Sequence, residues 1–517
     1  MSGQATLAEF VADVARRDGE KPALIFQDQP VTYAQLDALI ERAADGLAAR
    51  GVGHGDRVAL MLPNIPPFVV AYYAALRLGA IVVPVNLLYK ADEIAYILGD
   101  SEAKALVVYE GFYAQAGEAV RRAPSVECVV VVGQGLAPEG TTAWADLVGG
   151  GAPQRQPAAV APGDVAVICY TSGTTGRAKG AMLTHRNFIA NLEQMEAVGS
   201  MKMTAADVEL LVLPLFHIYA MNVGLNGAIR LGATVVLMLR FELLPVLEQI
   251  ERHRCTVFLG APPMYVAWVN TPGAERYDVS SLRVAGSGAA PLPAAVLARF
   301  RELTGVAIGE GYGLTETAPT THSNYVGDKG IRPGTVGLPL PGVECRLVDE
   351  HDREVSPGAE GEIVVRGENV MVGYWHQPEA SAEALRGGWF HTGDIATVDA
   401  DGYYTIVDRK KDMINAGGFK VWPREVEEVL YHHPAVQEAA VVPFPDPYAG
   451  ERPLAFVSLK AGQHATADDL IQYCRANLAS FKAPTRVEFR DDLPKLPTGK
   501  VLRRVLREEA RGLRTKV

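Results

Sequence analysis

The sequence predicts an α/β fold, with a large N-terminal domain of layered α/β subdomains plus a β-rich subdomain, and a small α+β domain at the C-terminus. Over residues 1–309, short apolar and mostly β-branched runs alternate with helical stretches, which is typical of layered sheets covered by helices. From Gly334 the pattern changes to short strands punctuated by Gly and Pro. A chain of 517 residues is also too long for a single hydrophobic core. We therefore expect two domains, residues 1–410 and residues 411–517.

The spacing of apolar residues predicts the individual elements. Helical spacing indicates helices over Thr6–Arg17 and Thr32–Arg50, and another helix after Thr184. The strands predicted for the large domain are Val58–Leu62, Ile81–Val85, Ala105–Val108, Val129–Val132, Val165–Cys169, Thr234–Met238, Thr256–Leu259, Arg283–Ala285 and Ala307–Gly309, followed by the β-rich runs Gly342–Val348, Gly361–Arg366 and Tyr403–Val407. The small domain is predicted to contain helices Pro423–His432 and Thr466–Ala479, strands Val436–Val442 and Leu454–Leu459, and a terminal helix after Val501.

Composition excludes several classes of function. A net charge of −11 and the absence of a long basic run argue against a nucleic-acid-binding protein. The five cysteines are scattered without C-x-x-C spacing, so we expect reduced thiols in a cytoplasmic protein and neither disulfides nor a cysteine metal site. The N-terminus lacks the basic and apolar pattern of a secretory signal. Residues 210–229 carry no formal charge, but Pro214, His217 and Asn222 favour a buried pocket wall over a membrane span.

The segment Tyr170–Gly180 has the composition of a phosphate-holding loop. It contains three glycines, four Ser or Thr residues and two cations directly after an apolar run. Glycines let backbone N–H groups approach an anion, and hydroxyls and a lysine add donors and positive charge. The spacing is not that of a Walker A loop, and an ordinary polar turn is the alternative. The candidate ligands are Thr171, Ser172, Gly173, Thr174, Thr175, Gly176 and Lys179.

Two further segments carry groups suited to a nucleotide. Gly311, Tyr312, Gly313, Thr315 and Glu316 place a ring, a hydroxyl and a carboxylate on one loop after a predicted strand, and Mg²⁺ on phosphates usually takes one carboxylate and waters. The small residues Gly286, Ser287 and Gly288 would let a ligand lie against the backbone, although a tight turn explains them nearly as well.

Five segments are ambiguous from the residues alone. Asp394 in a His-Thr-Gly-Asp run has a carboxylate that can accept both hydroxyls of a ribose, but it can equally cap a turn. The charged run Asp408–Asp412 reads as a solvated connector, and Gly417 with Gly418 as a turn before a helix. Lys500 in a Pro-Thr-Gly-Lys run reads as an exposed lysine at the start of a helix. His217 is expected at the end of a strand, and a lone histidine of this kind is more often a satisfied core residue than a catalyst.

Taken together, these motifs resemble the adenylate-forming superfamily of acyl-CoA synthetases, luciferases and adenylation domains, and most of all bacterial fatty-acid CoA ligases. The similarity runs from about Val31 to Arg504. The resemblance implies that Tyr312 stacks on adenine, that Thr315 contacts the α-phosphate and that Glu316 holds Mg²⁺. It also implies that the phosphate loop and Gly286–Gly288 bind ATP.

The resemblance assigns roles to the ambiguous segments as well. Asp394 and Arg409 would contact the ribose or a phosphate, and Lys411 would be the hinge about which a mobile C-terminal domain rotates. The segment that contains Gly417, Gly418 and Lys420 would line the passage for the pantetheine arm of CoA. The remaining two residues are Lys500, which would reach the substrate carboxylate and the α-phosphate, and His217, which would line or gate the acyl pocket.

The activity implied is that of an ATP- and Mg²⁺-dependent acyl-CoA synthetase that forms an acyl-adenylate and then a CoA thioester. A medium- or long-chain fatty acid is expected, with an aryl acid of the coumarate or benzoate kind as the alternative. Amino-acid adenylation modules carry an aspartate where His217 stands, which argues against such a module here. A catalytically silent scaffold would be expected to lack Glu316, Asp394, Arg409 or Lys500. All four are present, which argues against a scaffold. A luciferase-like oxygenase and a stand-alone adenylation enzyme remain alternatives, and a homodimer and a peripheral membrane contact stay open.

Overall fold

The computed structural model describes residues 6–149, 158–171, 177–198, 203–290, 292–327, 330–446, 449–495 and 501–513. Packing divides the chain into two compact units. The first comprises Met1–Glu344 and Val365–Phe390, and the second comprises Cys345–Val364 and His391–Val517. We expected a domain boundary after residue 410, where the C-terminal domain would begin to rotate. The division by packing does not test that boundary, so it stays a prediction.

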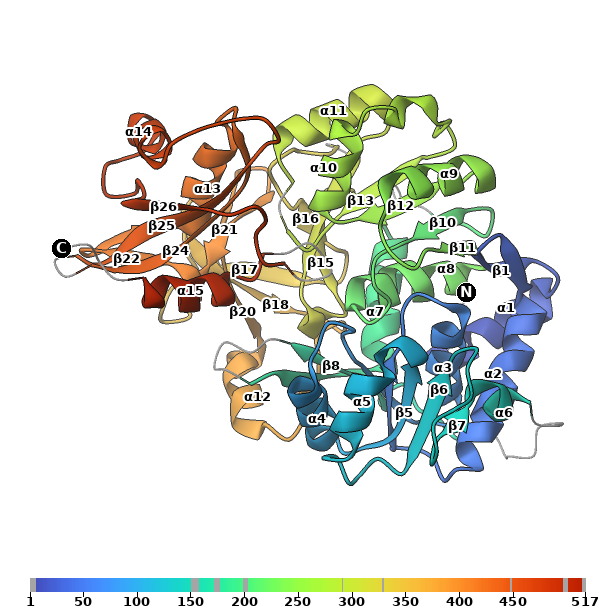
Figure 1. Cartoon of the computed structure of the whole chain (residues 1–517). Helices are drawn as coiled ribbons and strands as arrows, with labels where there is room; N and C mark the ends of the chain where they lie inside the picture. The colour runs from blue at the N-terminus through green and yellow to red at the C-terminus, as the bar shows by residue number, and fades with distance from the viewer. Residues whose placement is uncertain are drawn as a thin grey trace. The chain divides into compact units, whose positions relative to one another are not determined.

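The first unit contains an eight-stranded sheet in the order β19-β9-β8-β4-β3-β5-β6-β7. Its strands are β3 (Arg57–Met61), β4 (Ile81–Pro84), β5 (Ala103–Tyr109), β6 (Cys128–Val132), β7 (Thr142–Ala143), β8 (Val165–Thr171), β9 (Lys179–Thr184) and β19 (Gly373–Tyr374). Strands β3 to β8 are parallel, and their near-continuous apolar runs fit a sheet covered on both faces. Helices α4 and α5 lie side by side against β5 (Figure 1).

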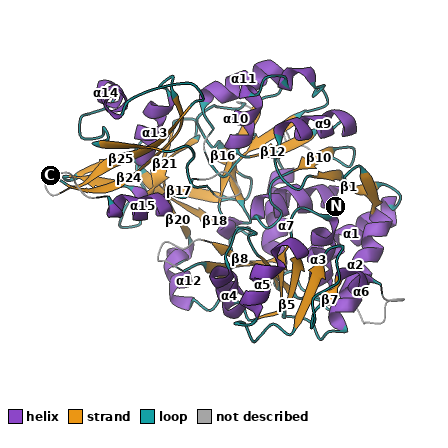
Figure 2. Ribbon diagram, in the orientation of Figure 1, coloured by secondary structure: helices purple, strands orange, loops and turns teal. Residues whose placement is uncertain are grey.

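The second sheet of this unit has nine strands in the order β16-β15-β14-β13-β12-β10-β11-β1-β2. They are β1 (Pro22–Phe26), β2 (Gln29–Thr32), β10 (Val208–Leu211), β11 (Thr234–Leu237), β12 (Val257–Gly260), β13 (Val284–Ser287), β14 (Ile308–Gly313), β15 (Thr320–Ser323) and β16 (Leu338–Pro339). Helices α10 and α11 pack together, and α9 packs beside β10 (Figure 2).

The helices of the first unit begin where the sequence supplies capping groups. Helix α7 begins after Thr184, whose hydroxyl accepts a hydrogen bond from the backbone N–H of Asn187 at 3.1 Å, and α2 begins after Thr32 in the same way. These helices are α1 (Phe10–Asp18), α2 (Tyr33–Ala48), α3 (Pro66–Arg77), α4 (Ala91–Asp100), α5 (Tyr113–Val120), α6 (Trp144–Val148), α7 (His185–Glu196), α8 (Gly227–Leu231), α9 (Leu243–His253), α10 (Pro262–Asn270), α11 (Ala294–Thr304) and α12 (Pro378–Ala384).

The uncharged segment after β10 forms a buried π-helix, Tyr219–Asn226, as expected of a pocket wall. In the part of the chain that the structure describes, no helix is both long enough and apolar enough to cross a membrane. The helix expected after Thr184 is α7, but strand β9 before it was not predicted. Strand β8 runs to Thr171, and the chain returns as β9, antiparallel to β8, before α7 begins.

The second unit is built on two smaller sheets. The four-stranded sheet has the order β17-β18-β20-β21, and the other has the order β23-β22-β25-β24, with β26 paired to β25. The strands are β17 (Glu344–Val348), β18 (Gly361–Arg366), β20 (Phe390–Val398), β21 (Tyr404–Arg409), β22 (Ile414–Ala416), β23 (Phe419–Val421), β24 (Val436–Asp446), β25 (Gly450–Leu459) and β26 (Arg486–Phe489). Helices α13 (Pro423–Tyr431), α14 (Ala467–Asn477) and α15 (Arg503–Gly512) complete the unit. The predicted α/β class is therefore confirmed, with a β-rich part and an α+β part.

A buried acid lies in the middle of the nine-stranded sheet. Glu209 on β10 is completely buried, and neither of its carboxylate oxygens has a hydrogen-bond partner among the described residues. Burial raises the pKa of this carboxyl from its ordinary value of 4.5 to about 8. Glu209 is therefore a neutral carboxylic acid at neutral pH, and it destabilises the fold.

This acid predicts a dependence of stability on pH. Between the unfolded and folded pKa values the unfolded chain releases the proton of Glu209 while the folded chain keeps it, so the free energy of unfolding falls as pH rises through that window. A rise in pKa from 4.5 to about 8 corresponds to a loss of about 5 kcal/mol. Glu209→Leu should therefore raise the melting temperature, and by more at about pH 8 than at about pH 5.5.

Thermal melts of the wild type and the variant at the two pH values measure this effect. Glu209→Gln is the matched control, because it removes the titration but leaves a polar group in place. Glu209→Gln should remove the part of the pH dependence that Glu209 causes. It should raise the melting temperature by less than Glu209→Leu does. A gap between wild type and Glu209→Leu that stays the same at both pH values would contradict the assignment.

Candidate active site

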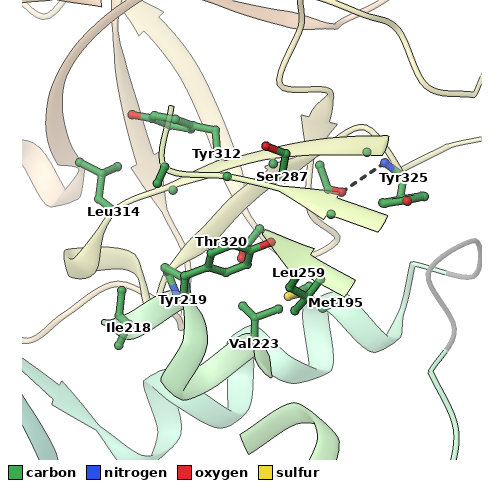
Figure 3. Close-up of a pocket in the computed structure, with 18 of the residues that line it drawn as sticks. Met195, Ile218, Tyr219, Val223, Leu259, Ser287, Tyr312, Leu314, Thr320 and Tyr325 are labelled. Carbon is green, nitrogen blue, oxygen red and sulfur yellow. Dashed lines mark hydrogen bonds between the residues drawn. The ribbon is translucent and has the colours of Figure 1, made fainter. Parts of the chain in front are cut away.

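A pocket lies at the carboxyl ends of β13 and β14, entirely within the first unit (Figure 3). Tyr312 and Ser287 lie at the upper edge of this view, and Tyr219, Val223 and Leu259 lie below them. The described ends of the strands and the π-helix supply nearly all the wall. The other lining residues are Met195, His217, Ile218, Gly286, Gly288, Ala289, Gly309, Gly311, Gly313, Leu314, Pro319, Thr320, Ser323 and Tyr325.

Glycines on two neighbouring strands create the room for this pocket. A Cβ atom added to Gly286 would lie 2.9 Å from Leu259 and 3.2 Å from the hydroxyl of Tyr219. At Gly309 it would lie 2.1 Å from the ring of Tyr325. The predicted residues Gly286, Gly288, Gly311 and Gly313 thus line the pocket, together with Gly309, which has the same small-residue signal but was not singled out from the sequence.

Tyr312 provides an aromatic surface on the pocket wall. Its backbone carbonyl accepts a hydrogen bond from the Thr321 hydroxyl at 3.2 Å, and its ring lies 5.7 Å from the ring of His322. Burial lowers the pKa of His322 to about 3, so the ring next to Tyr312 is uncharged. A partly exposed tyrosine ring beside small residues suits stacking on a planar base. The Oγ of Ser287, by contrast, is buried without a partner among the described residues.

Gly311, Tyr312 and Gly313 were expected in a loop, but they form the end of β14 and pair with β15. Glu316, just after this strand, joins it to the base of the predicted phosphate loop. Its Oε1 accepts hydrogen bonds from the Tyr374 hydroxyl at 3.0 Å and from the Thr171 hydroxyl at 3.4 Å. Lys179, the register partner of Thr171, places its Nζ 5.1 Å from the centre of the Tyr374 ring. Burial, together with Glu316, raises the pKa of Tyr374, so its hydroxyl stays a donor.

This cluster therefore unites four residues: Thr171, Lys179, Glu316 and Tyr374. Three of them were predicted as site residues. Tyr374 was missed, and no local signal marks it, because its contact with Glu316 forms only through tertiary packing. The predicted ligands Ser172, Gly173, Thr174, Thr175 and Gly176 lie outside the described residues. Thr315 opens the short 3-10 turn that carries Glu316.

The structure corrects the expected location of His217. It was predicted at the end of a strand, but β10 ends at Leu211, and His217 lies in a turn directly before the π-helix. The physical reason is Pro214, whose carbonyl accepts the His217 backbone N–H at 2.9 Å and closes this turn. The Nδ1 of His217 accepts the backbone N–H of Tyr219 at 3.3 Å, and the histidine lines the pocket.

In the second unit, Asp394 and Arg409 are register partners on β20 and β21. The Nε of Arg409 lies 3.1 Å from Oδ1 of Asp394, which is buried, whereas the arginine is partly exposed. The next residue, Lys410, lies 3.0 Å from the carboxylate of Glu362. Lys411 follows in a short 3-10 turn that ends at Asp412. The two predicted nucleotide-binding residues are thus held together on one sheet.

The pair Gly417 and Gly418 forms the two-residue turn of the β22–β23 hairpin, with φ values of 66° and 92°. Both are left-handed conformations that glycine adopts without strain, so the turn by itself explains the two glycines. Gly418 is exposed, and a Cβ added there would meet nothing within 4 Å. Lys420 is exposed on β23, with its Nζ 3.8 Å from Glu350.

Lys500 lies outside the described residues, but both ends of its segment are fixed. Lys495 and Val501 form an antiparallel bridge, and the backbone N–H of Leu502 donates to the Pro494 carbonyl at 2.7 Å. Helix α15 follows at once. Its Arg503 lies 3.2 Å from Asp408, 3.5 Å from Asp412 and 2.5 Å from Glu427.

This arrangement can hold a nucleotide and an acyl group in the first unit. Glycine-edged strands supply close backbone approach, Tyr312 supplies a stacking surface, and Glu316 supplies a carboxylate beside the phosphate loop. No group of three or more His, Cys, Asp or Glu residues placed to hold a metal ion occurs among the residues described. A single carboxylate with phosphate oxygens and water is nevertheless the usual environment of Mg²⁺, so Glu316 fits that ion.

Comparison with protein families identifies the class. Residues 11–375 match the AMP-binding enzyme family, and residues 425–500 match the AMP-binding enzyme C-terminal domain. The chain therefore belongs to the AMP-binding enzyme family, and the resemblance to adenylate-forming enzymes is confirmed.

Individual relatives are similar over nearly the whole chain. A long-chain-fatty-acid–CoA ligase of Bacillus subtilis is 37% identical over 98% of this chain and 94% of its own length. A feruloyl-CoA synthase of an Amycolatopsis species is 39% identical over 92% of both proteins.

Solved structures agree with the fold. The anthranilate CoA ligase AuaEII in complex with anthranoyl-AMP has a TM-score of 0.90 and 32% identity, covering 98% of this chain and 97% of its own. ATP-bound MatB from Rhodopseudomonas palustris has a TM-score of 0.87 and 33% identity, with 97% and 98% covered.

Proposed function

We propose that the protein is an ATP-dependent, AMP-forming acid–CoA ligase whose substrate is a medium- or long-chain fatty acid. The observation that carries the proposal is that an apolar pocket end and the segment that bears Glu316 follow one another along one wall of the first unit. The pocket end formed by Met195, Val223 and Leu259 is apolar, and the same cavity wall continues through Tyr312 to the loop that bears Glu316. The fatty-acid CoA ligases among the relatives match 98% of the chain, which supports the same substrate class.

The first half-reaction joins the acid to AMP. A carboxylate oxygen of the substrate attacks the α-phosphate of ATP, and pyrophosphate leaves. Thr171, Lys179 and the intervening loop would hold the phosphates, Thr315 the α-phosphate and Tyr312 the adenine. Lys500 would offset the repulsion between the two anions as they meet, which is catalysis by electrostatic stabilisation. Mg²⁺ would be held by Glu316, and it supplies charge neutralisation of the phosphates.

The second half-reaction transfers the acyl group to CoA. The CoA thiolate attacks the acyl carbonyl and AMP leaves, so the thioester forms without a covalent enzyme intermediate. Asp394 and Arg409 would contact the ribose, and the hairpin that contains Gly417, Gly418 and Lys420 would border the pantetheine arm. Lys411 would be the hinge between the two reaction states. A cytoplasmic location is part of the proposal and agrees with five cysteines that form no disulfide.

An aryl acid is the second candidate for the substrate. Two tyrosines, Tyr219 and Tyr325, line the pocket, and rings packed on rings favour flat substrates. The feruloyl-CoA synthase at 39% identity and the anthranilate CoA ligase at 32% identity show that aryl specificity occurs among similar proteins. The two candidates differ in how the rate depends on chain length.

A panel of acids decides between them. Each methylene buried in the apolar end contributes roughly 0.8 kcal/mol, so kcat/KM should rise about fourfold per carbon until the pocket ends. Initial rates of AMP release with butyrate through palmitate, and with benzoate and coumarate, measure this. A flat response along the aliphatic series combined with preference for an aryl acid would reject the fatty-acid proposal in favour of the aryl one.

Replacing Glu316 with glutamine should impair the adenylation half-reaction most when Mg²⁺ is limiting. The change keeps the shape of the side chain but removes the charge that would hold the ion. Pyrophosphate release should fall on the order of 10²-fold at low Mg²⁺ and partly recover at high Mg²⁺. Tyr374→Phe is the matched control, because it removes one hydrogen bond to Glu316 and keeps the carboxylate. Equal Mg²⁺ dependence in the wild type and in Glu316→Gln would show that another group binds the ion.

Lys500→Ala and Gly418→Leu should separate the two half-reactions. Loss of the Lys500 charge should slow adenylation by a factor on the order of 10²–10³ and leave thioester formation from supplied acyl-adenylate nearly unchanged.

Gly418→Leu should leave pyrophosphate release intact and slow thioester formation. Thermal melts control for strain, because leucine is unfavourable at the φ of 92° that Gly418 adopts. If both half-reactions fall together in each variant, the two residues do not act alternately and the domain rotation is excluded.

A further inference from the structure

The buried acid of β10 lies on the same face of the sheet as the pocket. Glu209 is the register partner of Val257, which stands two residues before the pocket-lining Leu259 on β12. Leu259 in turn pairs with Gly286 on β13, which also lines the pocket. Side chains two residues apart on a strand point to the same face, so Glu209 points toward the side of the sheet that the pocket occupies.

The carboxyl of Glu209 lies against the segment that forms the pocket wall. A Cβ atom added to Gly224 would lie 2.9 Å from Oε1 of Glu209 and 2.7 Å from Leu211. Gly224 belongs to the π-helix Tyr219–Asn226, and its neighbour Val223 lines the pocket. The carboxyl is therefore one residue away from the apolar end of the acyl site. A side chain at position 224 would have to displace the ends of the Glu209 and Leu211 side chains.

Nothing described in the fold satisfies this acid. Glu209 is fully buried, and both oxygens lack a hydrogen-bond partner among the residues that the structure describes. A buried polar group without a partner is costly, and native proteins keep few of them. A protonated carboxyl offers one O–H donor and one carbonyl acceptor, which together match a hydroxyl or keto oxygen. The missing partner can therefore be part of a bound substrate.

We propose that Glu209 is a specificity residue at the distal end of the acyl site, where it donates a hydrogen bond to an oxygen carried on the far carbons of the acyl chain. The preferred substrates are then hydroxy- or oxo-substituted fatty acids, and unsubstituted acids of the same length are weaker substrates. This inference rests on the proposed function, because it assumes that an acyl chain fills the pocket. The reacting carboxylate is fixed at the nucleotide end, so Glu209 meets the oxygen at one chain length only.

The experiment compares acids matched in length with the full-length enzyme. Unsubstituted, terminally hydroxylated and terminal methyl-ketone acids are assayed for AMP release across chain lengths from butyrate to palmitate. For the wild type, the ratio of kcat/KM for the oxygenated acid to that for the unsubstituted acid should peak sharply at one length. Glu209→Leu should lower this peak by about 5- to 100-fold, the range expected when a buried hydrogen bond is lost. Glu209→Gln keeps a donor and an acceptor and should retain most of the preference.

The outcomes separate the inference from the proposed function. If unsubstituted acids react but the ratio is the same in the wild type and in Glu209→Leu at every length, the inference is overturned and the proposed function stands. If no aliphatic acid reacts and only coumarate or benzoate does, the proposed function itself fails. If Glu209→Leu lowers the ratio for both the hydroxylated and the ketone series, Glu209 donates the hydrogen bond, as proposed. If it lowers the ratio for the hydroxylated series alone, Glu209 accepts the hydrogen bond and the proposed donation is overturned.

Thermal melts confirm that each variant is folded before rates are compared. Should Glu209→Leu not fold, Glu209→Met provides a second apolar side chain of similar length. Rates with the unsubstituted acids give an internal control, because an apolar residue at position 209 should leave them unchanged or raise them. A variant that loses activity equally with every acid would overturn a role in specificity.

Discussion

The absence of side chains at two neighbouring strand ends is the constraint on which the rest of the first unit depends. Gly286 on β13 and Gly309 on β14 leave the space that the rings of Tyr219 and Tyr325 partly fill. A methyl group at either position would collide with its neighbours, since protein interiors are close-packed. The cavity therefore exists because β-strands in a sheet, which favour bulky residues elsewhere, carry glycine here.

The same constraint orders the groups around the cavity. Tyr312 on β14 lines the pocket, and Glu316 follows in the short 3-10 turn after that strand, so one stretch of chain carries both the ring and the carboxylate. Hydrogen bonds from Thr171 and Tyr374 then fix the carboxylate between two other segments of the unit. Glu316 is thus held in place by contacts within the protein, which is the preorganisation that its proposed role would need.

The second unit is organised around a cluster of charged side chains. Arg503 is surrounded by Asp408, Asp412 and Glu427, and Arg507 also pairs with Asp412. Arg503 is half-buried, but its carboxylate partners are buried, so its removal would leave them uncompensated, which is strongly destabilising. Because Asp408 and Asp412 flank the proposed hinge and Arg503 follows the Lys500 segment, one ion cluster ties the hinge to the base of the loop that bears the proposed catalytic lysine.

The sequence by itself determined the class of fold and many of the elements, and it proposed the chemistry of the site. Periodicity located strands such as β3, β8 and β24 but not β9 or β10, and capping residues such as Thr184 marked the helix that follows β9. These features are local, because propensities and hydrogen bonds between near neighbours decide them. The same locality explains why the ring of Tyr312 and the carboxylate of Glu316 could be assigned to one loop.

Only the tertiary structure decided which distant residues meet. The contact of Tyr374 with Glu316 and the packing of Tyr325 on Gly309 join segments that no sequence pattern links. The sequence placed His217 on a strand, whereas the turn closed by Pro214 brings it to the start of a π-helix. Glu209 gave no signal at all, because its unpaired burial follows from strand order and from the glycine opposite it. Burial, pairing and the shape of a cavity are properties of the packed sheets, and a linear pattern cannot specify them.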